Sequence, residues 1–437
     1  YHFDEALALI EEARTIDFIA VKTYKLWLFR GEAMYGKGNI EQSIHAYEQA
    51  LAVATSAASK CTSLIGIANG LNTLDHFDLA VTALSQAESY ATELGLNTEL
   101  SQIHHLRGNF YFPTGEVDYC YAQQSEALKF AKLSENIEAE ARALGGLGDA
   151  AYAQGKMYQA YDYIKQCLGL CETHDFSQIE AANRFMLATT RIYQNETQEA
   201  LYDALTSANL AATVGHRRAE IVSRLTASWV LLDMLELEQA SEQVTLGLNL
   251  AQEIGALRFE PFLRESMARY YYLQGNFSAA EQEIRAAYNE VNTQQLERFI
   301  GPWVTSTYAL ILTMGKKTNK EKTFDLLQLG SEMLGRGCVG HNYYRFYVSA
   351  IECSIINHEW DDAHRFITLF TNYTKEQPTP WSDFYIDRAK TLVSAWQYLT
   401  DDRKDQLINT KINAKNNQLL ASVKLIDKTL HHLRVRI

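Results

Sequence analysis

Two short stretches combine residues of the types that bind phosphate or metal. Gly31-x-x-x-x-Gly36-Lys37 matches the first part of a phosphate-binding loop. However, Gly38 stands where such a loop needs Ser or Thr for Mg²⁺, and the preceding residues have a helical pattern. Cys167-x-x-x-Cys171-x-x-His174 places three metal-ligand types on neighbouring helical positions, without a second ligand cluster elsewhere in the sequence. We therefore predict neither a nucleotide loop nor a metal site, and no cofactor.

Two polar clusters could contact an anion or an acidic peptide. They are His104-His105 and His216-Arg217-Arg218, each at the start of or within a helical segment. An arginine side chain can bind a carboxylate with two hydrogen bonds, whereas solvation or packing between repeats is the alternative role for both clusters. The sequence contains no local signature of a Ser or Cys nucleophile, so we predict that this segment is not an enzyme.

The composition restricts the kind of protein that carries these residues. The chain has 437 residues, 47% of them hydrophobic, and only five prolines, which favours several domains or a repeat array of long helices. Its net charge of −13 disfavours direct nucleic-acid binding. There is no apolar run long enough for a transmembrane segment, and six scattered cysteines suit a reducing environment. We expect a cytoplasmic location.

A repeated pattern predicts the elements that position the polar clusters. Its clearest copy is Leu144-x-x-Leu147-Gly148-x-x-x-Tyr152-x-x-Gly155, which is typical of the first helix and turn of a tetratricopeptide repeat. A small residue in the second helix recurs in steps of 37 to 43 residues, mostly 40, because two antiparallel helices cross closely there. These small residues are Ser43, Ala80, Cys120, Ala160, Ala200, Ala240, Ala280, Thr323 and Ala363. We predict an all-α fold, a right-handed tetratricopeptide-like superhelix of antiparallel helix pairs (an α-solenoid).

The repeats are not equally regular along the chain. We predict regular repeats over 1–300, degenerate helical repeats over 301–400, and a C-terminal capping helix over 401–437. Phe3–Ala13 has the pattern of a second helix, so we expect the chain to begin inside a repeat and an upstream part to exist. Residues 403–437 carry eight Lys or Arg against two Asp or Glu. A detachable contact for an anionic membrane or another domain is therefore an alternative to the cap.

The first helices of such repeats line the inner, concave wall, which is where we expect a protein or peptide to bind. Projecting the repeat register onto the sequence gives polar and aromatic residues that point to this wall. The predicted binding residues are Tyr35, Asn69, Asn72, His105, Asn109, Arg142, Asp149, Tyr152, Tyr193, Trp229, Arg269 and Tyr272.

One part of the chain has a more specific resemblance. The stretches 146–155, 178–184, 214–220 and 227–232 resemble the C-terminal repeat region of bacterial multidomain proteins, in which a class III adenylate/guanylate cyclase domain and an AAA-type ATPase precede tetratricopeptide repeats. The chain is also similar, more broadly, to the superhelix of the maltose-regulon transcription activators, which bind a sugar inducer. The first resemblance implies a regulatory arm that contacts catalytic domains of its own chain. The second implies the inducer-binding domain of a transcription regulator, and a free-standing scaffold is a third possibility.

Overall fold

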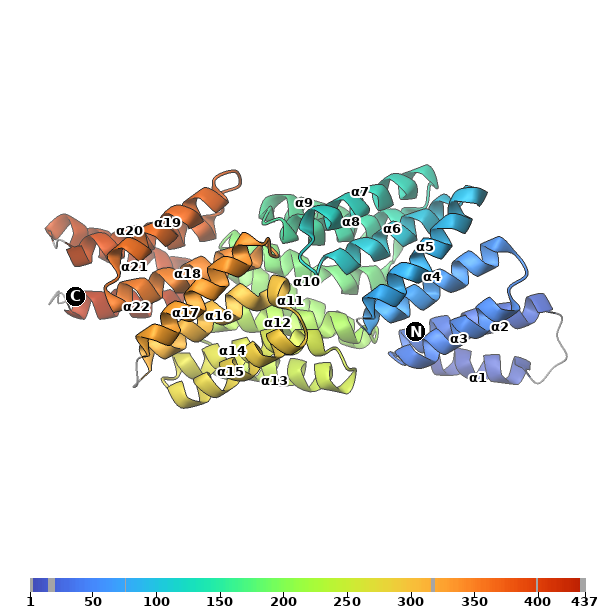
Figure 1. The fold of residues 1–437 in the computed structure, drawn as a ribbon, viewed down its shortest axis with the longest axis horizontal. Helices are drawn as coiled ribbons and strands as arrows, with labels where there is room; N and C mark the ends of the chain where they lie inside the picture. Colours follow the sequence, from blue (N-terminus) through green and yellow to red (C-terminus); the bar gives the residue numbers. More distant parts are fainter. Residues whose placement is uncertain (1–2, 15–19, 75, 316–318, 398–399, 433–437) are drawn as a thin grey trace.

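The computed structural model describes residues 3–14, 20–74, 76–315, 319–397 and 400–432. Over these residues the chain forms α-helices and two short 3-10 helices, with no β-strand. The helices follow one another as an elongated array from the N-terminal to the C-terminal end (Figure 1). They are α1 (Phe3–Arg14), α2 (Ala20–Gly36), α3 (Ile40–Val53), α4 (Ala57–Thr73), α5 (Phe77–Leu94), α6 (Asn97–Tyr111), α7 (Val117–Leu133), α8 (Ile137–Ala153), α9 (Met157–His174), α10 (Ser177–Tyr193), α11 (Thr197–Thr213), α12 (Arg217–Asp233), α13 (Leu237–Glu253), η1 (Leu257–Phe259), α14 (Glu260–Leu273), α15 (Phe277–Thr293), α16 (Glu297–Met314), α17 (Lys320–Gly335), α18 (His341–Asn357), α19 (Trp360–Thr374), α20 (Pro380–Gln397), α21 (Asp401–Asn416), η2 (Leu420–Ser422) and α22 (Val423–His432).

The helices are arranged as antiparallel pairs, from α2 and α3 to α20 and α21. The first helix of each pair packs against the first helix of the next pair, whereas consecutive second helices do not pack closely on one another. This difference bends the array so that the first helices line its inner wall. The predicted all-α, tetratricopeptide-like superhelix is confirmed.

The small residue of each second helix lies where the two helices of a pair cross. All nine predicted positions, from Ser43 to Ala363, are buried, and none is more than 4% exposed. Opposite Ala160, a Cβ atom added to Gly148 would come within 2.5 Å of the Ile164 side chain. The close crossing therefore requires small residues on both helices, as the sequence pattern indicated.

The turns between helices repeat with the same period. Left-handed backbone, with φ between 54° and 81°, recurs every 40 residues in both kinds of turn. Glycine adopts this conformation without strain, so its recurrence in the turns has a backbone cause. Between the first and second helices these residues are Gly115, Gly155, Asn195, Leu235 and Gly275; between a second helix and the next first helix they are Gly95, Glu135, Asp175, Gly215, Gly255 and Gln295.

Successive turns of the superhelix touch each other. The Gly340 amide donates a hydrogen bond to the Ala153 carbonyl at 2.7 Å, and the Tyr344 hydroxyl donates to the Gly155 carbonyl at 3.1 Å. Further along the contact, Arg298 donates to the Gly115 carbonyl at 2.8 Å and forms an ion pair with Glu116. The repeats after residue 298 thus pack onto the inner side of repeats some 180 residues earlier in the chain.

The C-terminal segment of the described chain contains two α-helices, α21 and α22, joined by η2. Leu419, Ile426 and Leu430 are buried, and the Ser422 carbonyl accepts two hydrogen bonds from Arg388 of α20, at 2.9 and 3.1 Å. These contacts place the segment against the last repeats. The division of the chain at residues 300 and 400 stays a prediction.

Candidate functional site: the inner wall

The predicted binding residues fall into three groups in the structure. Tyr35, Asn69, His105, Asn109, Arg142 and Asp149 keep part of their surface on α2, α4, α6 and α8. Asn72, Tyr152, Tyr193 and Trp229 are buried, at 7%, 3%, 2% and 6% exposed. Arg269 and Tyr272 line a cavity further along. The predicted binding residues therefore do not form one continuous surface in the structure.

The buried aromatic residues fill the contact between superhelical turns. The Tyr152 hydroxyl lies 3.1 Å from Nδ1 of His341, and the Tyr193 and Trp229 rings lie 4.8 Å and 5.0 Å from those of Tyr344 and Trp303. Burial lowers the pKa of His341 to about 3, so its imidazole is neutral, with Nε2 donating to the Phe299 carbonyl at 2.7 Å. In this arrangement the three aromatic residues stabilise the fold and have little surface left for a partner.

On α2 and α4, the predicted residues form a small hydrogen-bonded group. The Tyr35 hydroxyl lies 3.4 Å from the Asn69 side-chain oxygen and 3.1 Å from the Thr73 hydroxyl. The Asn72 side-chain oxygen is buried without a hydrogen-bond partner among the described residues. This group joins two consecutive first helices at the inner wall.

His105 and Asn109 belong to a network centred on Gln124 of α7. Asn109 donates to Nε2 of His105 at 3.1 Å, and Nδ1 of His105 lies 3.0 Å from the Gln124 side-chain oxygen. The Gln124 amide in turn donates to the Asn109 oxygen at 3.1 Å. Added Cβ atoms on Gly108 and Gly146 would overlap Gln124 at 2.3 and 2.2 Å, so these two glycines make room for it. The sequence reasoning missed Gln124; the glycines at 108 and 146 are the signal that could have indicated it.

Five polar residues from three elements form what we call the inner cluster. His105 lies on α6, Arg142 and Asp149 lie on α8, and His216 and Arg218 lie at the start of α12. Burial, together with the positive charges of Arg142 and Arg218, lowers the pKa values of His105 and His216 to about 4. Arg142 and Arg218 therefore lower the pKa of the same two histidines, although 76 positions separate them in the sequence.

Asp149 gives the inner cluster an unusual carboxyl group. Burial raises the pKa of Asp149 to about 7, and the positive charge of Arg218 lowers it in part. Its Oδ1 atom has no hydrogen-bond partner among the described residues. Arg142 is paired with Glu138 at 2.7 Å, while the Arg218 guanidinium lies over the Phe259 ring at 5.7 Å and forms no ion pair in the described part of the chain. The Arg218 guanidinium and the Asp149 carboxyl group are therefore available to bind a charged or polar group.

A cavity of about 340 Å³ lies at the other end of the inner wall. Arg269 and Tyr272 of α14 line it, with residues of α12, α16, α18, α20, η2 and α22. Arg269 binds Asp233 at 2.8 Å, and Arg345 lies 5.0 and 5.2 Å from the centres of two tryptophan rings. Sequence reasoning missed Arg345, because the period slips after residue 300 and the register could not be projected there.

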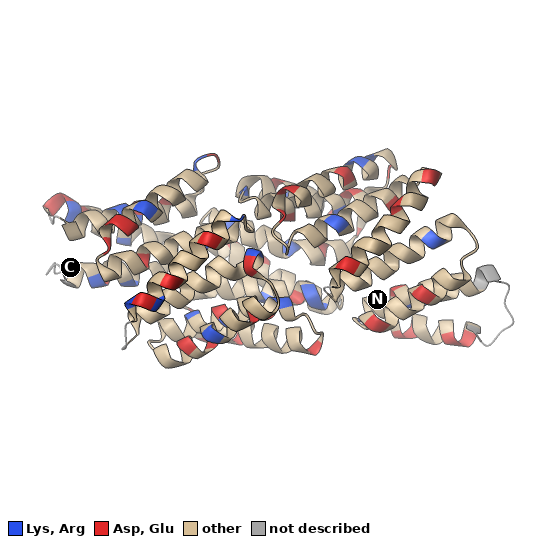
Figure 2. Cartoon of the chain, in the orientation of Figure 1, with Lys and Arg blue, Asp and Glu red and all other residues tan. Residues whose placement is uncertain are grey.

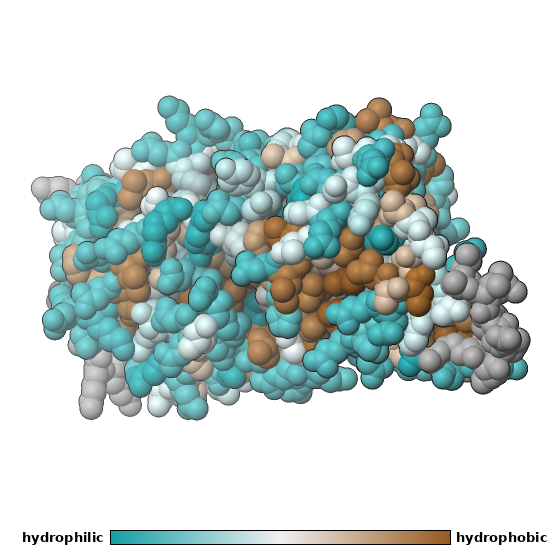
Figure 3. Space-filling model, turned by 45° about the vertical axis from the view of Figure 1, so that its right-hand side comes forward, coloured by the Kyte–Doolittle hydropathy of each residue, from teal (hydrophilic) through white to brown (hydrophobic). Residues whose placement is uncertain are grey.

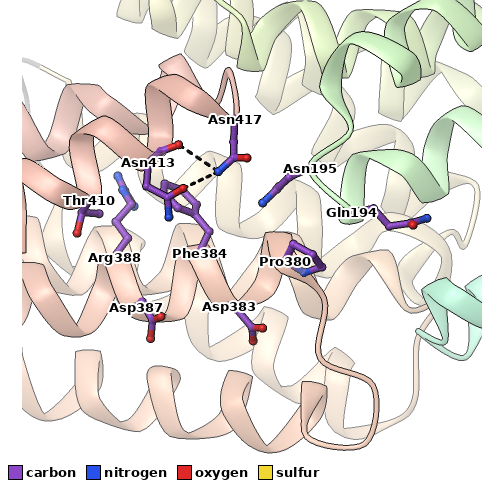
Figure 4. A pocket seen from close by; sticks show the side chains of 10 residues that line it. All are labelled: Gln194, Asn195, Pro380, Asp383, Phe384, Asp387, Arg388, Thr410, Asn413 and Asn417. Atoms are coloured by element: carbon purple, nitrogen blue, oxygen red, sulfur yellow. Dashed lines mark hydrogen bonds between the residues drawn. The ribbon is translucent and has the colours of Figure 1, made fainter.

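A second, polar hollow of about 290 Å³ lies where the turn between α10 and α11 meets α20 and α21. Figure 4 shows Asn413 and Asn417 hydrogen-bonded to each other, with Asp383 and Asp387 pointing away from them. Burial and the negative charge of Asp387 raise the pKa of Asp383. The Thr197 hydroxyl, at the start of α11, donates to the Asn417 carbonyl at 2.8 Å. We interpret the hollow as part of the contact between turns.

The motifs weighed for nucleotide and metal chemistry lie within helices. Gly31 and Gly36 are inside α2, and Cys167, Cys171 and His174 are inside α9. All six cysteines are buried and free. Within the described residues there is no group of three or more His, Cys, Asp or Glu side chains placed to hold a metal ion, and none of the described helices is long and apolar enough to cross a membrane.

The surface shows where contacts with other molecules could form. Acidic and basic residues alternate along the array (Figure 2). Figure 3 shows hydrophobic residues gathered across the middle of one face, with hydrophilic residues around them.

No family model matches the chain, and no curated protein matches it. Solved structures of similar fold include a Rap protein complexed with competence and sporulation factor, at 18% identity and a TM-score of 0.54 over 66% of this chain and 80% of that chain. A Rap conjugation gene regulator of the plasmid pLS20, in complex with the Phr* peptide, has 12% identity and a TM-score of 0.50 over 84% of this chain and 97% of that chain. The APC/C hetero-tetramer Cut9-Hcn1 has 11% identity and a TM-score of 0.52 over 93% and 76%. These similarities concern the fold: the chain is a tetratricopeptide-like repeat superhelix.

Proposed function

We propose that this chain is a non-catalytic interaction and sensor region that holds an acidic segment of a protein or peptide on its inner wall, at the inner cluster. The observation that carries the proposal is that the charges of Arg142 and Arg218 both act on His105 and His216, while Oδ1 of the nearby Asp149 has no partner within the described residues. The two arginines come from repeats that are not neighbours. A partner that contacts both therefore bridges two repeats that are not consecutive in the sequence.

The charges at the inner cluster favour an acidic partner. Its two histidines are neutral at physiological pH, because burial lowers their pKa values to about 4. Below pH 7 Asp149 is mostly protonated, so the cluster carries the charges of the two arginines; above pH 7 the ionised Asp149 offsets one of them. An arginine can bind a carboxylate with two parallel hydrogen bonds, so glutamate and aspartate side chains suit the site.

The fold similarities support binding of a peptide. Two of the similar structures are Rap proteins in complex with competence and sporulation factor or with the Phr* peptide. This chain has the same kind of superhelix, and a superhelical interior allows many weak contacts along an extended segment. The hydrophobic residues on one face (Figure 3) add apolar surface of the kind that interaction sites expose.

The proposal can be tested by selecting random peptides displayed on phage against the chain and measuring the affinity of the selected peptides by fluorescence anisotropy. We expect peptides rich in Glu and Asp, and at least about tenfold weaker binding to the Arg142→Glu/Arg218→Glu variant. A matched control is Arg285→Glu on α15, a second helix, because Arg285 also pairs with a glutamate four residues earlier but lies outside the inner cluster. Peptides that are not acidic, or that bind the double variant and the wild type equally, would refute the proposal.

We further propose that the chain is the regulatory arm of a cytoplasmic adenylate/guanylate cyclase that also contains an ATPase domain. The resemblance of 146–232 to such repeat regions supports this parent protein. A bound segment that prefers one curvature of the superhelix would shift the population of shapes and so move the attached domains. The test is to assay the intact protein for cyclic-nucleotide synthesis with and without a selected peptide. An intact protein without cyclase activity would leave the inducer-binding domain of a transcription regulator, or a free-standing scaffold, as the alternative.

A further inference from the structure

The cavity at the C-terminal end of the inner wall has walls from five consecutive first helices, α12 to α20, and is closed by η2 and α22. Its volume of about 340 Å³ is within the range of small-molecule sites. It is distinct from the inner cluster, because no residue of that cluster lines it.

The charges in the cavity wall do not balance. Five basic side chains line it (Arg269, Arg345, Arg388, Lys424 and Lys428) against three acidic ones (Asp233, Glu265 and Glu352), which is an excess of two positive charges. The side chains of Lys424 and Lys428 are exposed, and neither forms an ion pair in the described part of the chain.

The acidic side chains of the wall are already engaged. Asp233 binds Arg269 and Glu352 binds Arg388, each at 2.8 Å. Glu265 accepts a hydrogen bond from the Thr307 hydroxyl at 2.8 Å, and burial raises its pKa, which favours the neutral form. Asp233 also lies 3.9 Å from the Arg345 guanidinium, so Arg269 and Arg345 share it. The two basic side chains of the wall that have no ion pair in the described part of the chain are therefore Lys424 and Lys428.

The remaining wall is aromatic. The Arg345 guanidinium lies between the rings of Trp303 and Trp381, at 5.0 and 5.2 Å, and its Nε atom has no hydrogen-bond partner within the described residues. The Lys424 ammonium group lies 5.5 Å from the centre of the Tyr272 ring. Arg345 also lies 3.9 Å from the Asp233 carboxylate, whereas Lys424 and Lys428 form no ion pair in the described part of the chain. Flat rings beside these cations suit a ligand that combines a planar group with a negative charge.

We propose that this cavity binds a small organic anion with a planar ring, whose carboxylate or phosphate meets Arg345, Lys424 and Lys428 while its ring lies against the tryptophan and tyrosine side chains. Two of the three cations come from α22, so a bound anion would also hold this helix against the repeats. The cavity is thus a second site, for a small molecule, in addition to the proposed peptide site.

Isothermal titration calorimetry on the full 437-residue chain tests this proposal with two matched pairs of probes. The first pair is 2-naphthoate and its uncharged analogue 2-naphthalenemethanol; the second is AMP and adenosine. We expect the charged member of at least one pair to bind at least about tenfold more tightly than its uncharged analogue, because only the charged member can pair with the cations. Binding of 2-naphthoate alone would assign the site to carboxylates, and binding of AMP alone would assign it to phosphates.

The decisive variant is Lys424→Glu/Lys428→Glu. Both side chains are exposed, so we expect the variant to keep the wild-type circular dichroism spectrum and to bind the anion at least about tenfold more weakly. A matched control is Lys404→Glu/Lys415→Glu on α21, which changes the net charge equally but lies outside the cavity wall. The proposal is overturned if neither anion binds, if charged and uncharged probes bind alike, or if the two double variants weaken binding equally.

Discussion

Replacing Gly340 by alanine is expected to force apart two turns of the superhelix. Gly340 has ordinary helical backbone angles, φ −50° and ψ −39°, so its conformation does not require glycine. The requirement is space: an added Cβ would lie 2.6 Å from the Gly155 nitrogen and 2.7 Å from the Tyr152 carbonyl oxygen. These are backbone atoms, which cannot move aside as the end of a side chain can.

The size of the effect follows from these contacts. Ordinary contact begins at 3.4 Å, so the two backbones must separate by about 0.8 Å. That movement stretches the 2.7 Å hydrogen bond between the Gly340 amide and the Ala153 carbonyl. Overpacking of this kind costs about 1–3 kcal/mol and loss of the hydrogen bond about 1 kcal/mol. We expect Gly340→Ala to lower the free energy of unfolding by about 2–4 kcal/mol.

The assay is urea unfolding followed by tryptophan fluorescence, together with small-angle X-ray scattering of the folded variant. The control is Gly169→Ala: Gly169 is exposed within α9, and its added Cβ would meet no atom within 4 Å. Higher helix propensity should make that variant more stable by about 0.5–1 kcal/mol. If Gly340→Ala unfolds at the wild-type urea concentration with an unchanged scattering profile, the turns do not touch as described.

Three further predictions concern charge and backbone strain. Burial raises the pKa of Asp149 to about 7, so the folded state retains a proton that the unfolded state loses, and stability should fall as the pH rises from about 4 to 7. Asp149→Asn should flatten this part of a curve of stability against pH. An unchanged slope would contradict the burial of Asp149. Leu235 adopts a left-handed φ of 60°, so Leu235→Gly should stabilise the fold by up to about 1 kcal/mol. The control Leu246→Gly, inside α13, should cost about 1 kcal/mol. Equal shifts of the thermal unfolding midpoint in the two variants would exclude strain at Leu235. Arg269→Met should cost about 3–5 kcal/mol in chemical denaturation, because it leaves the buried Asp233 without its 2.8 Å partner, and a wild-type midpoint would show that the pair is not needed.

The repeat architecture could be predicted from the sequence because its determinants are local. Close crossing needs a small residue such as Ala160, and left-handed turns favour a glycine such as Gly155; both recur with the period of the helix pairs. The same register placed Arg142 and Asp149 on the inner wall. These features can be predicted from a single sequence because each repeat contacts mainly its neighbours.

Contacts between turns could not be predicted in this way. Tyr152, Tyr193 and Trp229 have the register of inner-wall residues, but the repeats after residue 298 cover them. Which segments meet depends on the superhelical pitch, a sum of small rotations over many repeats that no short pattern encodes. The position of Arg345 between two tryptophan rings has the same origin.

The most direct test of the proposed function is hydrogen–deuterium exchange of the chain with and without a selected acidic peptide. The account predicts slower exchange in α6, α8 and the start of α12, which carry the inner cluster, and unchanged exchange in the second helices α15 and α19. Protection confined to the second helices, or absent from both α8 and the start of α12, would contradict binding at the inner wall.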